Sequence, residues 1–349
     1  MNRPFIGKCF IQTPYTPSSG DDELRRDILV ATLAVALVAI FALGCMESAE
    51  ENKTVLCIGY QPSTHQVAEM VAMEQGWWLE DLKPFGIEKI VDFEFPSGPP
   101  EMQAMLAGEL DIAYVGAAPP ISAIGQGLDA KIAAAVQKNG SDLVVRPELD
   151  YTGPESLVGL KVATFPPGSI QDTVMKKWLK DNGVDPNKID IKSMGPGDAV
   201  TAISANRVDA VFLPHPSPSI IELEENGRSV VPSGEMWPNH ACCCLVVSGE
   251  LMREEPKLVE QIIKTHIKAT DYINEHPDEA AKIYSEKTGQ DLDIIVYSIQ
   301  TWDGAWISDP NTIIPSVMEF AAVQYDLGYT DHLLTQEEIF DTTFYDKVA

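Results

Sequence analysis

The segment AGELDIAYVGAAPP, residues 107–120, contains the strongest signal for the class of fold, because a short apolar run leads directly into small residues and prolines. Asp111–Val115 predicts a buried β-strand. The five residues after it predict a turn into a helix, since proline is tolerated in a first helical turn, where its missing N–H costs no hydrogen bond. A strand that passes through a short turn into a helix is the building unit of an α/β fold.

The same unit recurs on both sides of this segment, and the alternation of strands with helices indicates an α/β fold for most of the chain. Ser63 with Gln66 predicts a capping box at the start of the first helix. From Pro256 onward the sequence is mostly helical. Further strands are predicted at residues 54–60, 91–95, 131–136, 161–164, 189–193, 210–213 and 242–247.

Residues 1–45 predict a targeting segment that ends in a lipid-accepting cysteine. Arg25 and Arg26 precede an apolar run that reaches from Ile28 to Gly44, and Cys45 follows it in an arrangement that resembles a lipoprotein box. The run is shorter than the roughly 20 residues that span a bilayer, although an uncleaved anchor helix is the alternative. Both interpretations place the remainder of the chain outside the cytoplasm, tethered to the outer face of the membrane.

The net charge of −27 limits the classes of partner. Basic and acidic residues balance within residues 1–45, so the negative charge belongs to the rest of the chain. Such a charge argues against nucleic acid and against anionic lipid surfaces. It does not exclude a small anionic ligand, because helix N-termini present free N–H groups and a partial positive charge.

The predicted strand-to-helix turns are the candidate ligand site. Ligands of open α/β sheets lie at the carboxyl ends of the strands, and helix N-termini there suit a small anion. A single turn of this kind is more often only a helix cap, but two sets of such turns favour a cleft between two facing lobes. The turns lie at residues 61–63, 97–98, 116–117, 168–169 and 197–198.

Enzyme and metal motifs give no support for catalysis. The sequence contains no dinucleotide-binding, phosphate-binding, esterase or zinc-protease motif. Cys242–Cys244 lie on a predicted strand, where alternation places Cys243 on the opposite face from its neighbours, so we expect packing residues. His65, His215 and His240 could reach a cleft and join these cysteines around a metal. Their spacing fits no zinc pattern, so we expect no metal and no cofactor.

Four stretches carry a resemblance to a known family. They are GYQPSTHQVAEMVAMEQGWW (59–78), MLAGELDIAYVGAAPP (105–120), LVGLKVATFPPGSIQD (157–172) and RVDAVFLPHPSP (207–218). These stretches resemble the extracellular binding proteins of ABC importers for nitrate, sulfonate, taurine or bicarbonate, over about residues 54–300. The resemblance implies a two-lobed periplasmic-binding-protein fold of type II with two crossover hinges. It implies lobe 1 at residues 54–140 and 245–349, and lobe 2 at residues 142–240.

The same resemblance implies a function and a set of contact residues. The chain is expected to be a monomeric binding protein, not an enzyme, that delivers a small anionic solute to an ABC permease. The solute would lie between the lobes and stabilise their closed form. Contacts are expected from Gln61, Ser63, Ser97, Gly98, Gly116, Ala117 and Gln137 in lobe 1, and from Ser169, Gln171 and His215 in lobe 2.

The wider family leaves two alternatives open. It includes proteins that bind the pyrimidine of thiamine, and an iron-dependent pyrimidine synthase with a histidine and a CCC-x-C run. This sequence has Cys242-Cys243-Cys244-Leu245-Val246, so the fourth cysteine is missing. That departure and the export signal disfavour the synthase, while a pyrimidine-binding protein remains the alternative to an anion carrier.

Overall fold

The computed structural model describes residues 53–349, and residues 54–349 form one compact unit. The predicted signal segment, residues 1–45 with Cys45, lies outside the described residues. Within the described range, the helices do not reach the combination of length and apolar character that a membrane span needs.

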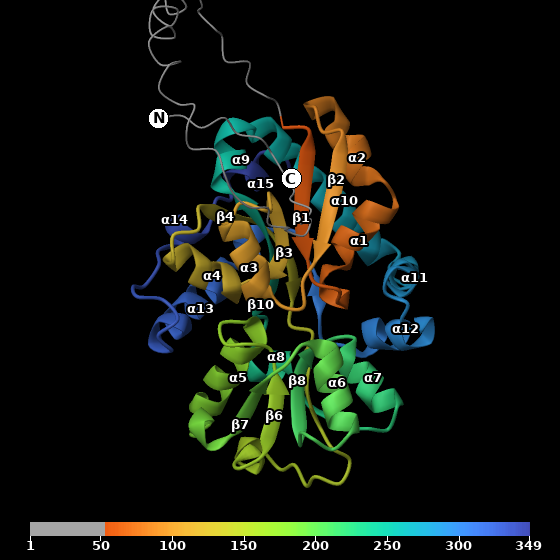
Figure 1. Ribbon diagram of the computed structural model, residues 1–349, viewed down its shortest axis with the longest axis vertical. Coiled ribbons are helices and arrows are strands. Elements are labelled where there is room, and N and C mark those ends of the chain that lie inside the picture. Colours follow the sequence, from red (N-terminus) through yellow and green to blue (C-terminus); the bar gives the residue numbers. More distant parts are fainter. Residues whose placement is uncertain (1–52) are drawn as a thin grey trace, which may run out of the picture. The chain divides into compact units, whose positions relative to one another are not determined.

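Two β-sheets organise the described chain (Figure 1). Within residues 53–349, the larger sheet, which we call lobe 1 together with its helices, has six strands in the order β11-β4-β10-β3-β1-β2. β1 pairs in parallel with β2 and β3, whereas β10 runs antiparallel to β3 and β4. Its strands are β1 (Val55–Tyr60), β2 (Lys89–Glu94), β3 (Ile112–Gly116), β4 (Ala130–Lys138), β10 (Ala241–Ser248) and β11 (Ala305–Trp306).

The second sheet, which we call lobe 2 together with its helices, has five strands within the described range, in the order β7-β6-β8-β5-β9. β6 pairs in parallel with β7 and β8, and β5 runs antiparallel to β8 and β9. Its strands are β5 (Ser141–Val145), β6 (Lys161–Thr164), β7 (Asp190–Ser193), β8 (Ala210–Pro214) and β9 (Arg228–Pro232).

Helices cover both sheets, which is why the central strands are apolar on both faces. In lobe 1 the early and late helices pack together, for example the first helix of the chain against α10 and α11. The lobe 1 helices are α1 (Val67–Glu74), α2 (Trp77–Leu82), α3 (Gly98–Leu106), α4 (Ala118–Gly125), α9 (Gly249–Glu254), α10 (Pro256–Glu275), α11 (Pro277–Thr288), α12 (Leu292–Thr301), α13 (Ile314–Asp326), α14 (Gln336–Ile339) and α15 (Thr343–Asp346). Those of lobe 2 are α5 (Ile170–Asp181), α6 (Pro196–Ser204), α7 (Ser217–Leu223) and α8 (Ser233–Met236).

Two short crossovers join the sheets, at residues 139–140 and 233–240. The Asp303 carboxylate binds both of them: Oδ1 accepts the N–H of Gly140 at 2.7 Å, and Oδ2 accepts the N–H of Gly234 at 2.6 Å. One side chain from the C-terminal helical region therefore fixes the two crossovers relative to each other.

The observed elements confirm the predicted α/β fold, and in lobe 2 the strands and helices lie close to their predicted positions. The strand predicted at 161–164 is β6, and the helix predicted after Ser169 is α5. The capping box at Ser63 and Gln66 is wrong. Residues Thr64–Gln66 form a short 3-10 helix, and the Gln66 Oε1 atom accepts the backbone N–H of Gln61 at 2.6 Å instead.

Candidate functional site

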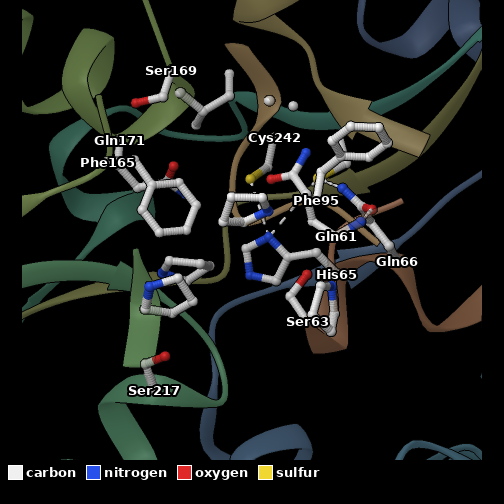
Figure 2. Close-up of a pocket in the computed structure, with 18 of the residues that line it drawn as sticks. Gln61, Ser63, His65, Gln66, Phe95, Phe165, Ser169, Gln171, Ser217 and Cys242 are labelled. Atoms are coloured by element: carbon white, nitrogen blue, oxygen red, sulfur yellow. Dashed lines mark hydrogen bonds between the residues drawn. The ribbon is translucent and has the colours of Figure 1, made fainter. Parts of the chain in front are cut away.

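A cavity of about 300 Å³ lies between the two lobes (Figure 2). Lobe 1 contributes the residues after β1 and β2 and the end of β3, and lobe 2 contributes the turns after β6 and β8. These are carboxyl ends of strands, so the cavity occupies the place where open α/β sheets bind ligands.

Most of the ten predicted contact residues meet at this cavity. Three of them lie outside the described lining. Ser97 is the buried N-cap residue of α3, and Ala117 donates its N–H to the carbonyl of Cys242. Gln137 is buried, and its amide donates to the carbonyls of Lys138 and Asn139. The residues that line the cavity are Gln61, Ser63, Gly98, Gly116, Ser169, Gln171 and His215.

The N-terminus of α5 presents backbone N–H groups at the cavity. Ser169 has extended backbone geometry, and its Oγ accepts the N–H of Asp172 at 3.2 Å, which is a standard N-cap. The starts of α3, α4 and α6 all contain proline, which has no N–H to offer. Because α5 has no proline in its first turn, every residue of that turn carries an N–H group, and these groups lie at the positive end of the helix dipole.

Two glutamine side chains of the cavity are held by the protein behind them. Gln61 Nε2 donates to the Oε2 of Glu101 at 2.7 Å, and Gln171 Nε2 donates to the Oγ of Ser141 at 3.1 Å. Burial raises the pKa of Glu101 well above its ordinary value, against the opposing effect of the Gln61 hydrogen bond. Each glutamine therefore enters the cavity in a defined orientation.

The cavity has little fixed positive charge. Among the described residues that line it, none is lysine or arginine, and its ionisable groups are His65, Glu94, His215, Cys242 and Cys243. Any attraction for an anion must therefore come from helix N-termini and hydrogen-bond donors. Two phenylalanines, Phe95 from lobe 1 and Phe165 from lobe 2, add apolar surface (Figure 2). No sequence motif marks either phenylalanine as a cavity residue.

His215 connects the lobes at the edge of the cavity. Its carbonyl accepts hydrogen bonds from the N–H and the Oγ1 of Thr64, on the lobe 1 side. Its Nδ1 lies 3.0 Å from the Oγ of Ser298 in α12, and its Nε2 lies 3.4 Å from the Oδ2 of Asp142. His215 therefore joins lobe 2 to two segments of lobe 1.

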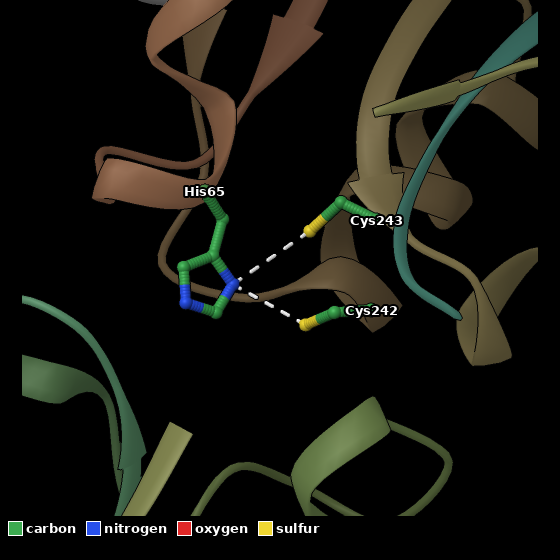
Figure 3. A group of neighbouring side chains, drawn as sticks. All are labelled: His65, Cys242 and Cys243. Carbon is green, nitrogen blue, oxygen red and sulfur yellow. Dashed lines mark hydrogen bonds between the residues drawn. The ribbon is translucent and has the colours of Figure 1, made fainter. Parts of the chain in front are cut away.

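The arrangement of the cysteines differs from the sequence expectation. Cys242 and Cys243 both line the cavity and both direct their sulfur atoms toward His65, at 3.2 and 4.0 Å from its Nδ1 (Figure 3). The prediction that they occupy opposite faces is wrong, because the register of β10 against β4 shifts between Ala241 and Cys243 and again after Cys243. A bulge of this kind breaks the alternation of side chains.

The Cys243 thiol has an unusual environment. Burial raises its pKa, but hydrogen bonds from Cys242 and His65 outweigh burial and bring the pKa below its ordinary value. Burial raises the pKa of Cys242 and of Cys244. The three consecutive cysteines were the one sequence signal for the grouping of Cys242 and Cys243 beside His65. On a regular strand adjacent residues do not share a face, so that signal did not predict the grouping.

Comparison with known proteins agrees with this geometry. A curated relative from Bacillus subtilis (strain 168), named for binding aliphatic sulfonates, is 25% identical over 328 residues and covers 93% of this chain and 97% of its own. The taurine-binding periplasmic protein of Escherichia coli (strain K12) is 22% identical over 187 residues, 53% of this chain and 58% of its own. These relatives are solute-binding proteins and not enzymes.

Solved structures share the fold. The alkanesulfonate-binding protein SsuA from Xanthomonas axonopodis pv. citri, bound to MOPS, has a TM-score of 0.73 at 19% identity and covers 83% of this chain and 99% of its own. The periplasmic nitrate-binding protein NrtA from Synechocystis PCC 6803 has a TM-score of 0.72 at 15% identity, over 84% and 88% of the two chains. Both neighbours are periplasmic binding proteins of the two-lobed fold. The model of the NMT1-like family matches residues 49–286, and the chain belongs to that family.

Proposed function

We propose that this protein is the extracytoplasmic solute-binding component of an ABC importer and that it captures a small sulfonate-type anion between its lobes. One observation carries the proposal: a cavity of about 300 Å³ at the carboxyl ends of strands from both sheets, with the N-terminus of α5 facing it. Relatives named for sulfonate and taurine binding support the class of solute.

The binding mode follows from the lining. The sulfonate oxygens would accept hydrogen bonds from the backbone N–H groups of the first turn of α5 and of Gly98. The organic part of the solute would lie against Phe95 and Phe165. Such a solute contacts both lobes at once, so it favours the arrangement in which they are closed. Further contacts with the solute would come from five residues that also line the cavity, namely Gln61, Ser63, Gly116, Gln171 and His215.

We further propose that the N-terminal segment tethers the protein to the outer face of the cell membrane and that the monomer delivers its solute to a membrane permease. The apolar run before Cys45 supports the tether. Replacing Cys45 with serine should release the protein from the membrane fraction or block its processing. An unchanged mass and membrane fraction would point to a plain anchor helix.

A neutral heterocycle is the second candidate solute, and one observation favours it. The described lining has no lysine or arginine, and it places a phenylalanine from each lobe in the same cavity. An aromatic ring that stacks on phenylalanine needs no cationic partner. Mass spectrometry of the small molecule that co-purifies with the protein tests both candidates: a sulfonate supports the first, and a pyrimidine overturns it in favour of the second.

A further inference from the structure

Two glutamine side chains present hydrogen-bond acceptors to the cavity. Gln61 lies on the lobe 1 side and Gln171 on the lobe 2 side (Figure 2). Each uses its Nε2 to bind a residue behind it, and within the described residues neither Oε1 accepts a hydrogen bond from the protein. The NH₂ group and the carbonyl oxygen of an amide diverge from the same carbon. A glutamine held through its NH₂ group therefore leaves its oxygen available to a solute in the cavity.

The orientation of the Gln61 amide depends on Glu101. This residue lies in the first turn of α3 and is fully buried, and its Oε2 accepts the Nε2 hydrogen of Gln61 at 2.7 Å. The carboxyl group fits closely against β1, since a Cβ atom at Gly59 would lie 2.9 Å from its Oε1. The backbone N–H of Gln61 is also held, by the Oε1 of Gln66 at 2.6 Å. Glu101 is therefore a positioning residue for the acceptor oxygen of Gln61.

Donors are scarce over the rest of the cavity lining. Among the described residues that line it, none is lysine or arginine, and six are prolines, which have no N–H group. A solute that displaces water from the cavity leaves the two glutamine oxygens without a donor unless it supplies one, and an unpaired buried acceptor weakens binding. The prolines are Pro62, Pro96, Pro119, Pro196, Pro214 and Pro216.

The acceptor of Gln171 lies beside the proposed anion site. Gln171 is the second residue of α5, so its side chain and the N–H groups that face the anion belong to the same helical turn. The cavity thus combines donors for an acid group with acceptors for a donor group. This combination suits a short solute in which the two groups lie close together.

We propose that the solute carries an amino group and that Gln61 and Gln171 select for it by accepting its N–H groups. Two acceptors require at least two N–H donors, which an ammonium group or an amino-substituted ring provides, whereas a hydroxyl group has only one. This specificity rests on the proposed function, because the solute must bind in this cavity. Among sulfonates it selects aminoalkanesulfonates over plain alkanesulfonates, and among neutral heterocycles it selects those with an exocyclic amino group.

Isothermal titration calorimetry of the full-length protein with two matched pairs of ligands tests the proposal. 2-Aminoethanesulfonate is compared with ethanesulfonate, and 4-aminopyrimidine with pyrimidine. In the pair that binds, the amino compound should bind at least about tenfold more tightly, the effect of one unpaired acceptor.

The two pairs separate this proposal from the proposed function. Equal affinities for the two sulfonates would overturn the amino specificity and leave the proposed function standing. Selective binding of 4-aminopyrimidine, with no response to either sulfonate, would support the amino specificity and overturn the sulfonate. No response to any of the four compounds would overturn both.

Variants show which residues cause the preference. Gln61→Met and Gln171→Met remove one acceptor each at similar side-chain length, and each should reduce the preference for the amino compound about threefold or more. Glu101→Met should reduce it through Gln61, whereas Glu101→Gln keeps an acceptor for Nε2 and should retain it. Gln103→Met, at an exposed position of α3, is the matched control.

Thermal unfolding shows which variants are folded, and the wild-type comparison decides the amino specificity even if one of them is not. A preference that is undiminished in folded Gln61→Met and Gln171→Met would overturn the assignment to these residues.

Discussion

The phenol of Tyr329 donates a 2.7 Å hydrogen bond to the Oδ2 of Asp172 and so joins the C-terminal region of lobe 1 to the first turn of α5 in lobe 2. Lys176 strengthens the contact, because its Nζ lies 2.6 Å from both the phenol oxygen and the Asp172 Oδ1. The N-terminus of α5 therefore both lines the cavity and hydrogen-bonds to lobe 1 through Tyr329. Closure of the lobes and formation of the anion site depend on the same element.

Tyr329→Phe should weaken solute binding by a few fold with little loss of fold stability. The substitution removes both inter-lobe hydrogen bonds of the phenol, the one to Asp172 and the one from Lys176. Asp172 and Lys176 keep their ion pair with each other, so the expected net cost is about 1 kcal/mol, and this shifts the lobes toward the open arrangement. Isothermal titration calorimetry measures the affinity. Tyr325→Phe is the control, since Tyr325 is exposed on α13. Equal affinities for the two variants would show that this contact does not contribute to closure.

Asp303→Asn should destabilise the connection between the lobes. Both carboxylate oxygens of Asp303 accept backbone N–H groups, one from each crossover, and an asparagine offers only one acceptor. Leaving one partly buried N–H opposite an NH₂ group costs about 1–3 kcal/mol. Urea unfolding measures the loss. Asp309→Asn should change little, because Asp309 uses a single oxygen, Oδ1, to cap its short helix. Similar losses in both would contradict a hinge role for Asp303.

Ser169→Ala separates capping from ligand binding. Removal of the Oγ that accepts the N–H of Asp172 should cost about 1 kcal/mol of stability. If the hydroxyl also contacts the solute, the affinity should fall about fivefold beyond any change in folding. Calorimetric titration and urea unfolding on the same preparation measure both quantities. Full affinity with lowered stability would leave Ser169 with its capping role alone.

Glu69 should make the protein less stable as the pH rises. Burial raises the pKa of Glu69 from 4.5 to about 8, while Lys287 opposes the shift. The folded state thus keeps a proton that the unfolded state releases above about pH 4.5. The resulting stabilisation is complete below that pH and is lost as the pH rises through 8.

Glu69→Gln removes this titration, so its free energy of unfolding should vary less than that of the wild type between pH 5 and pH 8, roughly the interval between the two pKa values. Glu74→Gln, an exposed position in α1, is the control and should follow the wild type. Urea unfolding at several pH values measures the difference. Parallel pH profiles for wild type and Glu69→Gln would contradict the raised pKa.

Local sequence patterns predicted the fold and most of the cavity. Regular periodicity predicted β6 and the core of β1, and the strand-to-helix turn at residues 168–169 predicted the start of α5, because these signals depend only on near neighbours. Gly98 and Gln171 could be placed at the cavity because they adjoin such turns.

What the sequence could not predict depends on tertiary contacts. The shifted register of β10 reverses the expected direction of one cysteine, and that shift is set by pairing with β4, more than 100 residues earlier in the chain. The Gln66 side chain does not form the predicted capping box but hydrogen-bonds to the backbone N–H of Gln61 and to the Sγ of Cys243. Phe95 and Phe165 follow their strands without any distinctive motif. No pattern of near neighbours encodes these positions.

A sulfonate that binds between the lobes should stabilise the folded protein against heat. Thermal unfolding of the full-length protein should be measured with taurine, short alkanesulfonates, nitrate, bicarbonate and a neutral pyrimidine. We predict that a sulfonate raises the unfolding temperature, since a ligand at 100 times its dissociation constant adds about 2.7 kcal/mol. Calorimetry should then give one site per chain, weakened by Tyr329→Phe. Stabilisation by the pyrimidine alone, with no response to any anion, would contradict the account.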